Sequence, residues 1–126
     1  MCFACGQNNP IGLRLKFELI DGKYTTKFTP RTEHQGYDDI THGGIVSTLL
    51  DEAMAKLVWS MGRFAVTADL KVRFKKRALV GEELTVTGWV KSETRRLLSC
   101  AAEARNPRGE LIAEAEGTMV EVSQVV

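Results

Sequence analysis

The longest apolar periodicity in the sequence runs from Thr41 to Met61, and it predicts an amphipathic helix. Apolar residues recur there at i, i+3, i+4 and i+7, which makes one broad side of a helix apolar. Elsewhere the chain is typical of strands and turns, so this one helix must supply much of the core. The apolar positions are Ile45, Val46, Leu49, Leu50, Ala53, Met54, Leu57, Val58 and Met61.

Strand patterns lie on both sides of this helix. Residues 13–19 alternate apolar and charged side chains, as a half-buried strand does. Asp21-Gly22 is a favoured hairpin turn, so residues 23–29 should return as the second strand. The predicted order is β-β-α-β-β-β-β, an α+β fold in which an antiparallel sheet of about six strands wraps around one long helix. The four strands expected after the helix lie within residues 67–75, 84–90, 97–105 and 111–122.

Length and composition narrow the class of protein. The 126 residues suit one domain over 1–126, and a net charge of +1 gives no reason to expect nucleic acid as a partner. No apolar run approaches the roughly 18 residues of a membrane span, so we expect no membrane partner. Three cysteines, an odd number, favour a reducing cytoplasm over a disulfide framework. One helix cannot cover both faces of such a sheet, so we expect a homodimer.

The predicted helix begins with His42-Gly43-Gly44. Backbone N–H groups in the first helical turn have no intrahelical partner, and glycine leaves them open to a ligand. The helix dipole also favours negative charge there, as stabilisation of an oxyanion requires. His42 suits orientation or capping of this loop better than a role as catalytic base. The alternative is that the glycines only permit tight packing of the helix on the sheet.

Two acidic residues interrupt the apolar pattern of the helix. Asp51 follows His42 by nine residues, about 13 Å along the axis, so it cannot serve an oxygen bound at its own helix start unless the ligand is long. Across a dimer interface, Asp51 of one subunit could act as general base beside the glycines of the other. The alternatives are a solvated acid or an ion pair with Lys56. Glu52 lies at the opposite margin of the apolar stripe, and the helical wheel alone does not choose between the two acids.

Two further clusters raise the question of a ligand. Cys2 and Cys5 have the spacing of half a zinc site, but structural zinc usually takes four ligands and only Cys100, His34 and His42 remain. We therefore expect no metal and a packed, reduced N-terminal turn.

A basic run ends in Lys75, Lys76 and Arg77, and it is either a solvated sheet face or a contact for substrate phosphates. The pairs Arg95-Arg96 and Arg105 with Arg108 are alternative phosphate contacts.

The segment His42-Gly-Gly-Ile-Val-Ser-Thr-Leu-Leu-Asp-Glu-Ala53 resembles that of the hotdog-fold acyl-CoA thioesterases, particularly the PaaI-like branch. The sequences Cys-Phe-Ala-Cys-Gly at residues 2–6 and Asn-Pro-Ile-Gly-Leu at 9–13 are similar to the lead-in of that group. The resemblance implies hydrolysis of an acyl-CoA to a free acid and CoA, with no cofactor beyond the CoA of the substrate. It also implies an obligate homodimer, often paired into a tetramer, with the substrate bound between subunits.

The resemblance also assigns roles. Asp51 becomes general base or nucleophile, and the amides of Gly43 and Gly44 from the other subunit polarise the thioester oxygen. Thr67 matches a Ser or Thr early in the strand after the helix, although a bulge or twist is needed to aim it at the site. Gln35 is the nearest match to an upstream Asn or Gln, about one residue out of register.

We expect Glu52 to be secondary to Asp51, as a residue that binds the substrate. The alternatives to hydrolysis of acyl-CoA are an acyl-carrier-protein substrate, a non-catalytic acyl-thioester-binding dimer, or a hotdog dehydratase that uses His42.

Overall fold

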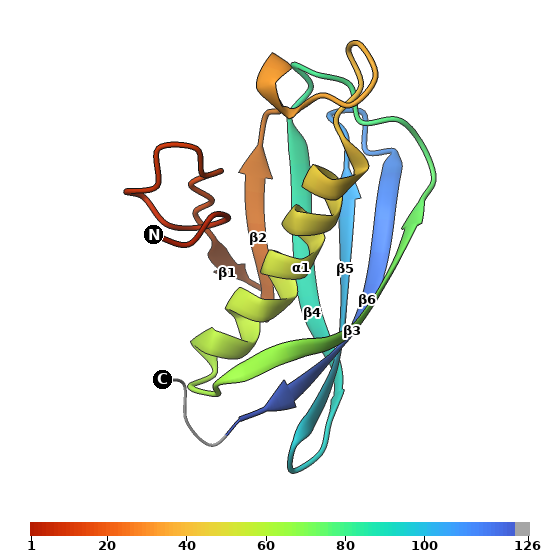
Figure 1. Ribbon diagram of the computed structural model, residues 1–126. Coiled ribbons are helices and arrows are strands. Elements are labelled where there is room, and N and C mark those ends of the chain that lie inside the picture. The colour runs from red at the N-terminus through yellow and green to blue at the C-terminus, as the bar shows by residue number, and fades with distance from the viewer. Residues whose placement is uncertain (123–126) are drawn as a thin grey trace.

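The computed structural model describes residues 1–122, and it contains one long helix held in a curved sheet (Figure 1). The element order is the predicted β-β-α-β-β-β-β, with a short 3-10 helix, η1, at Thr32–His34 before the long helix. Asp21 and Gly22 both have positive φ, 53° and 77°, as the predicted hairpin turn requires. The elements are β1 (Glu18–Ile20), β2 (Lys23–Phe28), α1 (Gly43–Ser60), β3 (Ala65–Phe74), β4 (Leu84–Glu93), β5 (Leu97–Arg105) and β6 (Leu111–Glu121).

The six strands form one sheet in the order β1-β2-β4-β5-β6-β3, and all neighbours are antiparallel. The predicted fold class, an antiparallel sheet wrapped around one helix, is confirmed. The chain crosses from β2 over the sheet through α1 to β3, which pairs only with β6. Therefore β3 lies at the edge of the sheet, and among the described residues no strand pairs with the other side of its backbone. Among the described residues, no helix has both the length and the apolar character needed to cross a membrane.

Helix α1 lies directly against the concave face of the sheet (Figure 1). A Cβ atom at Gly88 of β4 would stand only 2.7 Å from the backbone oxygen of Ala53, so the helix backbone touches the strand there. Of the predicted apolar positions, Ile45 is only half-buried and Met61 lies just past the helix end. The buried helical residues are Val46, Leu49, Leu50, Ala53, Met54, Leu57 and Val58.

The first predicted strand is wrong over most of its length, because only β1 is extended and paired with a neighbouring strand. The N–H groups of Leu13 and Leu15 donate instead to the backbone oxygens of Phe3 and Ala4, at 2.8 and 2.9 Å. Arg14 between them has φ 53°, which breaks the extended run. The alternation nevertheless marks burial, since Leu13 and Leu15 are buried while Arg14 is exposed.

Candidate functional site

His42 caps the start of α1. Its ring Nδ1 accepts a hydrogen bond from the Gly44 N–H at 2.8 Å, and its backbone oxygen accepts from Ile45 and Val46. An Nδ1 that accepts carries no proton, so in this arrangement the neutral ring holds its proton on Nε2. A Cβ at Gly44 would lie 3.0 Å from the same Nδ1, so residue 44 has little room for a side chain. The expectation that His42 orients and caps agrees with this geometry.

The cap leaves Gly43 as the open donor at the helix start. Gly44 donates to His42, and within the described chain no acceptor is recorded for the Gly43 N–H. Of the two predicted amides, only that of Gly43 is therefore free to meet a substrate oxygen in this conformation. The buried hydroxyl of Thr41 also lacks a hydrogen-bond partner among the described residues.

Beside this helix start lies a cavity of about 620 Å³. Tyr37, Val46 and Phe74 contribute apolar walls, and His42 and Gly43 line it from the helix. Its other border is the basic run Lys75, Lys76 and Arg77, which follows β3. The cavity thus joins an apolar space, a free backbone donor and a positive border, a combination suited to a ligand with an acyl end and an anionic end.

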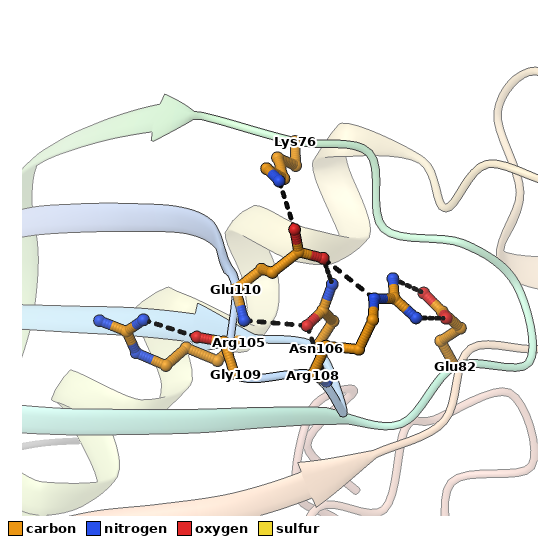
Figure 2. A network of polar contacts seen from close by, with 7 residues as sticks. All are labelled: Lys76, Glu82, Arg105, Asn106, Arg108, Gly109 and Glu110. Carbon is orange, nitrogen blue, oxygen red and sulfur yellow. Dashed lines mark hydrogen bonds and ion pairs between the residues drawn. The ribbon is translucent and has the colours of Figure 1, made fainter.

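An ion-pair network occupies part of that border (Figure 2). Lys76 donates to Glu110, which also accepts from Asn106 at 2.8 Å and from Arg108 at 3.0 Å. These hydrogen bonds, with that from Lys76 the strongest, lower the pKa of Glu110 to about 2. Arg108 in turn donates to Glu82 at 2.7 Å. The charge of Lys76 is therefore largely compensated by the protein itself.

The three basic residues of the border are consequently not equivalent. Lys75 Nζ lies 3.8 Å from a carboxylate oxygen of Glu114, and Lys76 is held by Glu110. Within the described residues, Arg77 has no ion pair. Sequence reasoning missed this difference because Glu110 follows Lys76 by 34 residues, and only the pairing of β3 with β6 brings the two together.

Asp51 belongs to a second group of polar side chains, at the edge of the sheet. The Thr67 hydroxyl donates to Asp51 Oδ1 at 2.8 Å, from the half-buried face of β3. A bulge makes this contact possible. Thr67 is paired with Met119 and Asp69 with Thr118, which leaves Ala68 as an extra residue. The strand therefore changes face between Thr67 and Asp69, as the role expected of Thr67 requires.

One chain does not bring Asp51 and Gly43 together. They are eight residues apart on α1, which corresponds to about 12 Å along the axis. Asp51 is half-buried beside β3, whereas Gly43 lines the cavity at the helix start. Within one chain, the two groups are therefore too far apart to contact the same ligand atom.

Two other predicted site residues lie elsewhere. Gln35 Oε1 accepts from the Asp39 N–H at 3.0 Å, so it fastens the loop before α1, and no recorded contact within residues 1–122 joins it to Asp51. Glu52 faces Cys2 and Cys5 of the N-terminal segment. The alternative ion pair of Asp51 with Lys56 is not among the ion pairs of the described chain.

Residues 39–113 match the thioesterase superfamily. Human acyl-coenzyme A thioesterase 13 is 28% identical over 100 residues, which cover 77% of this chain and 71% of that protein.

Two solved structures are similar in fold. A hypothetical thioesterase from Streptococcus pneumoniae, solved with coenzyme A, has a TM-score of 0.82 at 22% identity and covers 89% of this chain and 88% of its own. Escherichia coli PaaI, from the phenylacetic acid degradation operon, has a TM-score of 0.80 at 23% identity, with 86% and 83% covered. Two variants of the S. pneumoniae protein have also been solved. In one an aspartate is replaced by alanine, and in the other a threonine sixteen positions later is replaced by alanine.

The match spans more than half of the chain, and the fold of these structures is the one described above. The resemblance to the hotdog-fold thioesterases is thus confirmed, and the chain belongs to the thioesterase superfamily.

Proposed function

We propose that this protein hydrolyses an acyl-CoA thioester to a free acid and CoA, in a homodimer whose active sites each draw on both subunits. The observation that carries the proposal is the hydrogen bond from Thr67, on the edge strand β3, to Asp51 on α1. Asp51 lies on the same helix as the free Gly43 amide but about 12 Å from it along the axis. The human relative named for acyl-CoA hydrolysis and the S. pneumoniae structure with CoA support the substrate class.

The edge strand supports the dimer. Within residues 1–122, no strand pairs with the outer side of β3. The apolar residues of β3 include Val66 and Phe74, which are 53% and 54% exposed. Such an edge pairs readily with another strand. If a two-fold axis perpendicular to β3 relates two such strands, they run antiparallel, and so do the two α1 helices. The start of one helix then lies alongside the later turns of the other. The resemblance extends the proposal to a dimer of dimers.

The reaction follows from these parts. Asp51 either attacks the thioester carbon or takes a proton from a water that does so. Thr67 holds Oδ1 of Asp51 and leaves the other oxygen to act. The Gly43 N–H of the partner donates to the oxyanion that develops on the carbonyl oxygen. The carbon–sulfur bond then breaks. If water attacked, the proton taken up by Asp51 passes to the departing thiolate of CoA, and the acyl group leaves as the acid. If Asp51 attacked, the thiolate takes a proton from solvent, and a water then hydrolyses the acyl–Asp51 anhydride to the acid. Asp51 and Thr67 have the same sixteen-residue separation as the aspartate and threonine replaced in the S. pneumoniae protein.

Replacement Asp51→Asn tests the reaction. The amide has nearly the same shape but is neither base nor carboxylate nucleophile, so we expect kcat to fall by about 10²- to 10⁴-fold with the fold retained. Thiol release is measured over a panel of short, medium, long and aromatic acyl-CoAs. The control Asp21→Asn makes the same chemical change in an exposed turn that accommodates asparagine.

Near-normal turnover in Asp51→Asn would contradict the role of Asp51. Binding of acyl-CoA by the wild type with no thiol release across the panel would support the non-catalytic alternative. Hydration of an enoyl-CoA that depends on His42 would support the dehydratase.

A pair of substitutions at Gly43 tests the oxyanion donor. Proline is well tolerated at the first helical position, and the extended backbone of His42, φ −58° and ψ 136°, suits a following proline. Gly43→Pro thus removes one N–H with little change to the helix, and we expect kcat to fall by about 10²- to 10³-fold. Gly43→Ala keeps the N–H, and its Cβ would lie 3.4 Å from Phe74, so it should stay within about threefold of wild type. Equal activity of the two variants would exclude this amide as the donor.

Arg77 should contribute more than Lys76 to binding of the CoA phosphates, because the charge of Lys76 is already compensated by Glu110. We expect Arg77→Gln to raise KM for an acyl-CoA by about tenfold, with kcat almost unchanged, and Lys76→Gln to raise it by less than about threefold. Steady-state kinetics with the matching acyl-pantetheine, which lacks the nucleotide, is the control, and neither variant should alter it. A larger effect of Lys76→Gln would contradict this assignment.

A further inference from the structure

We propose that Cys2, Cys5 and Glu52 form a zinc site that fastens the N-terminal segment to the middle of α1. One ligand atom from each residue lies within 4.8 Å of the other two. Zn²⁺ binds cysteine sulfur and carboxylate oxygen in proteins. Cysteine ligands favour Zn²⁺ over Mg²⁺ or Ca²⁺. Three protein ligands leave one position of a tetrahedral ion for water, and Cys2 is exposed to solvent.

The turn that carries the two cysteines is closely fixed. The Gly6 N–H donates to the Cys2 backbone oxygen at 2.9 Å, which closes the turn that contains both cysteines. A Cβ at Gly6 would lie 2.5 Å from the Cys2 nitrogen, so only glycine fits there. Ala4 inside the turn is buried, and its oxygen accepts from the Leu15 N–H at 2.9 Å. The cysteines are therefore held together before any ion binds.

Glu52 is the ligand that sequence reasoning did not count. It follows Asp51 directly, but successive helical residues point about 100° apart, so Asp51 faces β3 while Glu52 faces the N-terminal segment. Cys100, the other cysteine, is buried in β5 and is not part of this group. The cysteine pair thus gains its third donor from a residue 47 positions away from Cys5.

The surroundings of the two thiols shift their pKa values in opposite directions. Burial, and then the hydrogen bond with Glu52, raise the pKa of Cys5 to about 12. Burial also acts to raise the pKa of Cys2, but the backbone N–H groups of Cys5 and Ala4 and the Cys5 side chain lower it overall.

Metal content and thermal stability test the site. The full chain is produced with a C-terminal removable tag free of histidine, and zinc is measured by mass spectrometry before and after chelation. We expect one zinc per chain. When Zn²⁺ is added back to the chelated protein at a concentration a hundredfold above Kd, its Tm should rise by about 10 °C. Cys2→Ser and Glu52→Gln should each weaken zinc binding by at least about tenfold. Cys100→Ser, at a cysteine outside the group, should leave it unchanged.

Substitution of Co²⁺ in the wild-type protein gives a readout that does not depend on how the variants fold. Thiolate ligation should produce a sulfur-to-cobalt charge-transfer absorption, and Zn²⁺ should abolish it. The proposal is overturned if the wild type binds neither ion, if Glu52→Gln binds zinc as tightly as wild type, or if intact mass shows Cys2 and Cys5 joined as a disulfide after purification under reducing conditions. None of these measurements uses thioester hydrolysis, so they do not depend on the proposed function.

Discussion

The contact between the backbone of α1 and that of β4 determines where everything else can lie. At Gly88 there is no room for a side chain between the strand and the Ala53 oxygen. Leu49, Leu50 and Met54 of the same helix are fully buried. A helix held this closely cannot slide or roll without opening the core. Its start, its middle and its two margins are therefore fixed relative to the strands.

Three chemical groups use different parts of this fixed helix. Gly43 offers a free N–H at the start, Asp51 accepts from Thr67 on the side of β3, and Glu52 meets Cys5 on the side of the N-terminal segment. The distance along the axis separates the amide from the acid, and the rotation per residue separates the two acids. The proposed need for two subunits follows from the first separation. The proposed zinc site follows from the second.

The sequence predicts the elements with a strong period and misses those that depend on distant partners. The helix, five of the strands and the turn after Asp21 follow from local patterns. The stretch before β1 alternates in the same way, but its N–H groups bond to Phe3 and Ala4, which no periodicity reveals. The need for a bulge near Thr67 could be anticipated, because regular alternation along the strand places Thr67 on the same face as Asp69 and Lys71. The contacts of Glu52 and of Lys76 could not, since both join segments far apart in the chain.

The most direct test of the account is a hybrid dimer with Asp51→Asn in one subunit and Gly43→Pro in the other. The two chains are co-expressed with different tags, and the hybrid is isolated by successive affinity steps. If each site takes its acid and its amide from different subunits, one site of the hybrid is intact and the other lacks both groups. The account predicts about half of the wild-type thioesterase activity per dimer, although each parent homodimer is almost inactive. A hybrid no more active than its parents would contradict it.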